Sequence, residues 1–142
     1  MLTEPAPSVQ QFFQSYRRAF EQYDADGIGE LFAYPGLVIS DDDQVDLTPV
    51  AIRREWVRNL EHLLGTYRRI RFASARILEL AAAELSPRLH QAVVHWELYD
   101  DADRTLYDFQ ATYTLAEAGG GLRIAAVAHN ELPRLRARLA EH

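Results

Sequence analysis

The chain has 142 residues, carries a formal net charge of −6 and contains neither cysteine nor lysine. A chain of this length forms one ordinary domain with a sizeable core. The missing residue types exclude disulfides, thiolate nucleophiles, cysteine-ligated metal centres and lysine Schiff bases. The acidic balance argues against a nucleic-acid partner, which usually requires a basic surface. Carboxylates, hydroxyls, imidazoles and arginines must therefore carry any chemistry.

The first residues of the chain have neither the basic region nor the apolar segment of a signal peptide. No apolar run approaches the roughly 20 residues that a membrane helix needs. We therefore expect a cytoplasmic protein without membrane contact. Residues 1–7 hold two prolines and are expected to form a flexible tail.

Helical spacing of apolar residues dominates the first part of the domain. Ser8 and Gln11 form a capping-box pattern at the start of an amphipathic helix that extends to residue 23. Asp26 is expected to cap a short second helix, and an acidic hairpin tip follows at residues 41–43. Thr48 and Pro49 predict the start of a long helix ending near residue 65.

The second half of the chain changes to strand periodicity. Alternating stretches are predicted over residues 67–85, 90–99, 106–115 and 122–129, and the turns between them are too short for parallel crossovers. Residues 132–142 form a short basic tail or helix. The pattern predicts an α+β, cone-shaped fold over residues 8–131, with N-terminal helices packed on a strongly curved, mainly antiparallel sheet.

Large rings should converge between these helices and the sheet, as either a ligand pocket or a filled core. Ala126 and Ala128 lie on the face of the last strand that is expected to point inward. Such small residues would leave space, and native cores contain few voids, so they favour a pocket. The predicted lining is Phe20, Phe32, Trp56, Leu60, Phe72, Val94, Trp96, Phe109, Tyr113, Ala126 and Ala128.

Metal and cofactor motifs are absent from the sequence. The acidic residues 41–43 lack the spacing of a cation-binding loop, and the histidines show no HxH or HExxH pattern. No GxSxG, P-loop or GxGxxG motif occurs. We therefore predict neither a metal nor a cofactor. His129, at the end of the last strand, is the best imidazole candidate for a site.

The order of elements over about residues 8–130 resembles the nuclear transport factor 2-like superfamily, which includes SnoaL-like cyclases, scytalone dehydratase and ketosteroid isomerase. The similarity lies in Phe13–Tyr16, Asp26–Phe32, Ala51–Arg53 and Gly121–Ile124. It implies a cone with an internal pocket and a homodimer formed through the outer sheet face. Because one fold supports many chemistries, the resemblance implies fold more than function.

The similarity to ketosteroid isomerase extends to single positions. Tyr16 stands where that enzyme has an oxyanion-donor tyrosine, and Ser40, followed by Asp41, stands where it has its general base. Ala111 matches its second oxyanion donor, and Trp56 matches a supporting tyrosine. Since only Tyr16 keeps its residue type, steroid isomerisation by that mechanism is not implied.

The sequence thus predicts a protein that binds a small apolar or aromatic molecule in a cone-shaped pocket. One alternative is a cofactor-independent isomerase, dehydratase, cyclase or hydrolase, in which Tyr16 donates to an oxyanion and Asp41 or His129 acts as base. Another is a non-catalytic dimerisation or interaction module. The enzyme alternative requires an ionisable group with a shifted pKa in the cavity, close to Tyr16.

Overall fold

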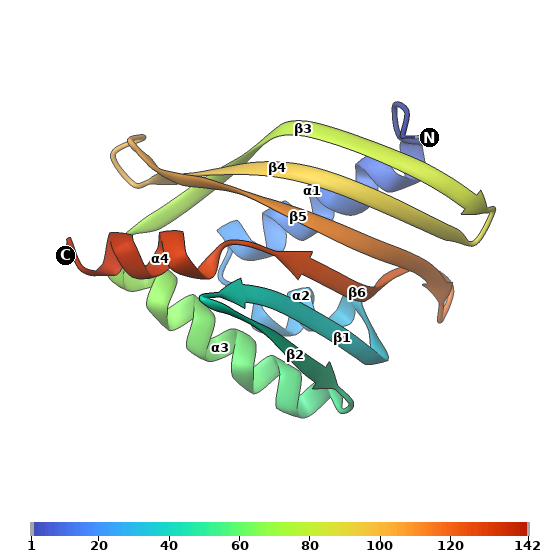
Figure 1. Cartoon of the computed structure of the whole chain (residues 1–142), viewed down its shortest axis with the longest axis horizontal. Helices are drawn as coiled ribbons and strands as arrows, with labels where there is room; N and C mark the ends of the chain where they lie inside the picture. Colours follow the sequence, from blue (N-terminus) through green and yellow to red (C-terminus); the bar gives the residue numbers. More distant parts are fainter. Residues whose placement is uncertain (1, 142) are drawn as a thin grey trace.

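The computed structural model describes residues 2–141, which form four helices and one six-stranded sheet (Figure 1). The strands lie in the order β2-β1-β6-β5-β4-β3, and all neighbours are antiparallel except β1 and β6. This confirms the predicted α+β class. The elements are α1 (Pro7–Glu21), α2 (Ala25–Glu30), β1 (Phe32–Asp42), β2 (Gln44–Val50), α3 (Arg53–Arg69), β3 (Phe72–Ser86), β4 (Leu89–Asp100), β5 (Thr105–Ala118), β6 (Gly121–His129) and α4 (Leu132–Leu139).

The sheet curves around the helical layer, with α1 behind β4 and β5 and with α3 beside β1 and β2 (Figure 1). Alternating residues of β4 and β5 are buried on the helical side, as the period of two requires. The segment before α1 is tied to the sheet, because Thr3 and Ala82 exchange two backbone hydrogen bonds of 2.9 Å. The alternation in β4 and β5 thus places the core residues of these strands on the face of the sheet that the helices cover.

The first two helices begin at other residues than the sequence predicted. Helix α1 begins at Pro7, with Ala6 as N-cap, rather than being capped by Ser8. Proline suits the first helical turn because its missing N–H would have no partner there anyway. Asp24, not Asp26, caps α2, since its Oδ1 accepts from the N–H of Gly27 at 3.0 Å.

The long helix also has other bounds than predicted. Pro49 belongs to β2, an edge strand of the sheet, where a missing N–H is tolerated. Helix α3 starts at Arg53 and continues through Gly65 to Arg69. Leu64 and Tyr67 bury their side chains from one helix face, so packing overrides the helix-ending tendency of the glycine. Tyr67 is thus helical, and β3 begins only at Phe72.

An irregularity in the pairing of β5 with β6 changes which residues of β6 face inward. Thr114 pairs with Ala126 but Leu115 pairs with Ile124, so Ala125 is an extra residue. Such a bulge shifts the alternation by one residue. Val127 and His129 therefore face the helices, while Ala126 and Ala128 face outward. The structure does not support the predicted inward position of these two alanines.

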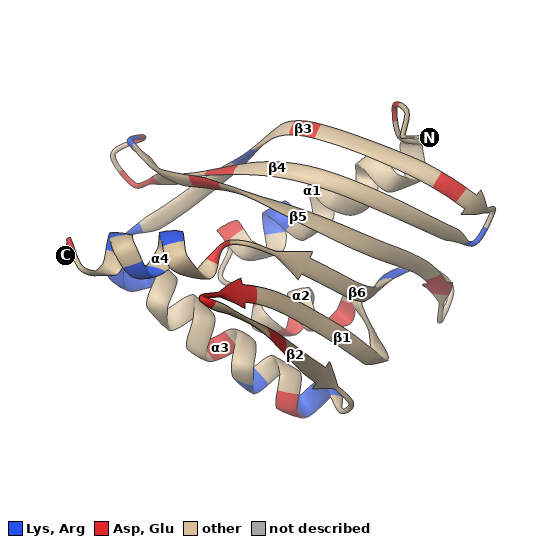
Figure 2. Cartoon of the chain, in the orientation of Figure 1, with Lys and Arg blue, Asp and Glu red and all other residues tan. Residues whose placement is uncertain are grey.

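Charged residues of both signs lie close together along the chain where β6 is followed by α4 (Figure 2). Arg136 of α4 pairs with Asp42 near the tip of the β1–β2 hairpin. The pair helps to fasten α4 over this end of the fold. In the described residues, no helix is long and apolar enough to cross a membrane.

Candidate functional site

A cavity of about 100 Å³ lies between α1, α3 and the inner face of the sheet. An apolar cavity of roughly 150 Å³ can hold benzene, whereas drug-sized ligands occupy about 300–1,000 Å³. The cavity is therefore far smaller than a drug-sized site and nearer in volume to the space that one ring occupies. Of the predicted lining, the cavity is bordered by Phe20, Phe32, Trp56, Leu60, Phe72, Trp96, Phe109 and Tyr113, together with the predicted site residues Tyr16 and His129. Val94 is fully buried and is not part of the wall.

Tyr16, on α1, lies among these rings. The ring centroids of Phe20 and Tyr113 are 5.1 Å and 5.9 Å from that of Tyr16. Burial raises the pKa of Tyr16 well above 10, and the nearby Tyr113 and Glu131 add to this shift. The hydroxyl is therefore neutral over the physiological pH range, and it donates a hydrogen bond to the hydroxyl of Tyr113.

A second tyrosine hydroxyl is polarised by an indole. The Nε1–H of Trp96 donates to the hydroxyl of Tyr113 at 2.9 Å, and both side chains are buried. Burial raises the pKa of Tyr113, although this donated bond opposes the shift. A hydroxyl that accepts such a bond becomes a stronger donor itself.

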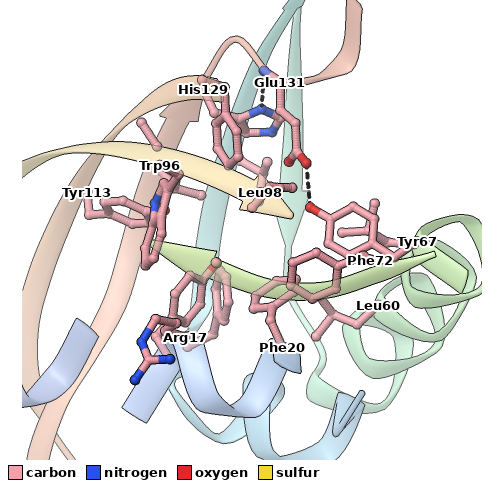
Figure 3. Close-up of a pocket in the computed structure, with 18 of the residues that line it drawn as sticks. Arg17, Phe20, Leu60, Tyr67, Phe72, Trp96, Leu98, Tyr113, His129 and Glu131 are labelled. Carbon is pink, nitrogen blue, oxygen red and sulfur yellow. Dashed lines mark hydrogen bonds between the residues drawn. The ribbon is translucent and has the colours of Figure 1, made fainter. Parts of the chain in front are cut away.

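The carboxylate nearest to Tyr16 in this cavity is Glu131, which the sequence analysis did not select. Glu131 follows β6 and occupies the N-cap position of α4. The hydroxyl of Tyr67 donates to its Oε2 (Figure 3). The hydroxyl of Tyr107 donates to the same oxygen at 2.7 Å. Burial raises the pKa of Glu131, and the two donated bonds partly oppose this rise. A buried carboxylate held by two hydroxyls thus lies in the cavity wall.

His129 faces the same cavity from the end of β6. Its Nδ1 accepts from the backbone N–H of Glu131 at 3.2 Å, which assigns the proton of the neutral ring to Nε2 (Figure 3). Burial lowers the pKa of His129 below 6.5, so the ring is neutral at pH 7. It offers one N–H donor.

Asp41 is not brought to Tyr16. Val38 and Ser40 of β1 are buried, and side chains alternate between the two faces of a strand, so Asp41 lies on the outer face. Its side chain is exposed there and borders a depression on the outer surface. Ser40 pairs in register with His129. Glu131 supplies the cavity carboxylate that Asp41 was expected to supply. In the sequence, Glu131 could have been selected because it lies two residues after the candidate His129.

The remaining charged wall residue is Arg17. Its guanidinium binds Glu21 at 2.8 Å and Gln14 at 2.9 Å, and it is turned away from Glu131 (Figure 3). Between residues 2 and 141, no three carboxylate or imidazole side chains come close enough to hold a metal ion. The site therefore combines neutral hydroxyls, a neutral imidazole and one carboxylate inside walls of rings.

This curved sheet with its covering helices and internal cavity defines an NTF2-like cone. A family model described as NTF2-like protein (DUF6841) matches residues 4–132. The chain therefore belongs to this NTF2-like family. A search of curated proteins found no match.

Solved structures share the fold. Aln2 from a Streptomyces species has a TM-score of 0.71 and 13% identity, with 95% of this chain and 99% of that chain covered. An NTF2-like protein with a cystatin-like fold from Novosphingobium aromaticivorans has a TM-score of 0.69 and 12% identity, with coverage of 93% and 86%. An NTF-2 like protein of unknown function from Shewanella oneidensis has a TM-score of 0.64 and 16% identity, with coverage of 89% and 99%.

Proposed function

We propose that the chain binds a small, largely apolar molecule with a single ring in the cavity between α1, α3 and the sheet. The observation that carries this proposal is the cavity itself, a space of about 100 Å³ with walls made mostly of rings. Protein interiors are closely packed, so a void of this size is unusual in a filled core.

The ring walls also suit the shape of such a ligand. Tyr16 packs against Phe20 at 66° between ring planes, and Phe32 packs against Trp56 at 61°. Aromatic rings prefer such tilted arrangements, so the ring of a ligand can pack against these walls in the same way. The few polar groups in the wall then orient the ligand, which is the usual composition of a small-molecule site.

Binding of toluene tests this function. We expect saturable binding by calorimetry, which the substitution Ala75→Leu weakens at least about tenfold because the added side chain fills the cavity. Ala83→Leu, on the outward face of the same strand, is the matched control and should leave binding unchanged. Absence of toluene binding to the folded wild type would contradict the proposal. Native mass spectrometry of protein from its own host would show any retained small molecule.

A second candidate function is cofactor-independent acid–base catalysis, as in an isomerase, dehydratase, cyclase or hydrolase. It is favoured by Glu131 and His129, whose pKa values are shifted toward each other by burial in one cavity wall. Tyr16 would donate to an oxygen on which negative charge develops. Groups with a pKa moved toward the working pH are suited to proton transfer.

Proton exchange in D₂O tests the catalytic candidate. For cyclohexanone, a base breaks the C–H bond beside the carbonyl, accepts the proton, and a deuteron from solvent returns to the carbon. We expect wild-type protein to accelerate deuterium incorporation, measured by NMR, and Glu131→Gln to remove most of that acceleration. Exchange at the rate of buffer alone would leave ligand binding as the supported function.

A further inference from the structure

The two oxygens of the Glu131 carboxylate have different surroundings. Oε2 accepts from both Tyr67 and Tyr107. Oε1 accepts from no residue in the described part of the chain, yet it is not sealed by packing and retains accessible surface. Glu131 as a whole is only 7% exposed, and it lines the cavity.

We propose that Oε1 of Glu131 accepts the hydroxyl proton of the bound molecule, so that the cavity selects a neutral ring carrying an O–H group. This inference rests on the proposed binding function and adds the chemical class of the ligand. A buried acceptor without a donor is costly, so a ligand that supplies the donor gains affinity. His129 contributes a neutral N–H donor to the same wall, from which the ligand's hydroxyl oxygen accepts.

The charges in the wall disfavour an anionic ligand. Glu131 is the carboxylate in the wall, and an anion beside it would be repelled in a poorly solvated space. Arg17 carries the guanidinium among the described wall residues, and this group already binds Glu21 and Gln14. The cavity therefore lacks a free positive group for a carboxylate or phosphate.

Hydrogen-bond capacity disfavours an ammonium ligand. An ammonium carries three donors, whereas Oε1 is the free carboxylate oxygen of the wall. The oxygen of Tyr113 already accepts from Trp96. An ammonium would thus leave N–H groups unpaired in the cavity. A hydroxyl has one donor and matches one free acceptor.

The test compares ring ligands that differ in one group. Calorimetry at pH about 8, where phenol is neutral, would measure phenol, anisole, toluene, benzoate and benzylammonium on the whole chain. We expect phenol to bind about 10- to 100-fold more tightly than toluene or anisole, the range typical of a hydrogen bond to a charged group. Benzoate and benzylammonium should bind more weakly than phenol.

The variant Glu131→Gln should reduce the preference of phenol over toluene, taken as the ratio of the two affinities on the same protein, to within about threefold. Glu117→Gln, an exposed carboxylate on β5, is the matched control and should keep the preference. If toluene binds but phenol binds no more tightly than toluene, or benzylammonium binds more tightly than phenol, the inference is overturned while the binding function stands. If no ring binds, both fail. The phenol–anisole pair decides the question on wild-type protein even if the variant does not fold.

Discussion

Tyr67 and Glu131 are 64 positions apart in the chain, and the buried hydroxyl of Tyr67 donates to Oε2 of Glu131. The bond joins α3 to the start of α4, and Tyr107 of β5 donates to the same oxygen. One carboxylate oxygen thus connects three elements at one wall of the cavity. The other oxygen, Oε1, accepts from no residue in the described part of the chain.

Tyr67→Phe should destabilise the fold by about 1.5–3 kcal/mol, because it removes a hydrogen bond to a buried carboxylate. Urea denaturation measures the free energy of unfolding. Tyr34→Phe is the matched control, since the hydroxyl of Tyr34 donates to the neutral carbonyl of Gly29 at 2.7 Å. It should cost only about 0.5–1.5 kcal/mol. Equal losses in the two variants would contradict the special role of the carboxylate.

The Trp96–Tyr113 bond should appear as coupling between two substitutions. Each of Trp96→Phe and Tyr113→Phe removes the bond of 2.9 Å, so the double variant cannot lose it twice. We expect a coupling of about 0.5–1.5 kcal/mol between them in a double-mutant cycle of unfolding free energies. Strict additivity would show that the bond contributes no net stability.

Local patterns predicted the fold class and most of the ring wall. Tyr16 and Phe20 follow one another at helical spacing, and Trp96, Phe109 and Tyr113 occupy alternating strand positions, so periodicity alone assigns their faces. These positions agree with the cavity because packing of an amphipathic face decides both element and orientation.

The polar part of the site did not follow from such patterns. Glu131 owes its place to tyrosines on α3 and β5, and no spacing in the sequence shows a contact over 64 positions. The extra residue Ala125 in β6 reversed the expected faces of Ala126 and Ala128. A bulge depends on pairing with the neighbouring strand, so alternation within one strand does not reveal it.

Stability should fall below pH 6.5 partly through His129. Burial lowers the pKa of the folded-state imidazole below 6.5, so the unfolded chain binds this proton first as the pH drops. The contribution is complete above pH 6.5 and is lost as the pH falls through the folded-state pKa. His129→Asn keeps an acceptor but does not titrate. We therefore expect the variant to lose less unfolding free energy than wild type between pH about 7 and about 5.5.

Glu131 changes the unfolding free energy with pH in the opposite direction, and comparing His129→Asn with wild type cancels this contribution. The pKa of Glu131 is raised above 4.5, so its protonation stabilises the fold as the pH falls. That effect is common to both proteins. Parallel stability profiles for the two proteins would show that His129 does not carry the dependence.

The outer face of β1 and β2 should mediate association of two copies of the chain. Val45 and Leu47 are 63% and 64% exposed there, and they lie beside Ile39 and the outward-facing Ala128. Exposed apolar side chains gathered on one face favour a protein partner. We expect light scattering to give a dimer mass for wild type and a monomer mass for Val45→Glu or Leu47→Glu. Leu85→Glu, equally exposed near the end of β3, should remain dimeric. A monomer mass for wild type at all concentrations would contradict this expectation.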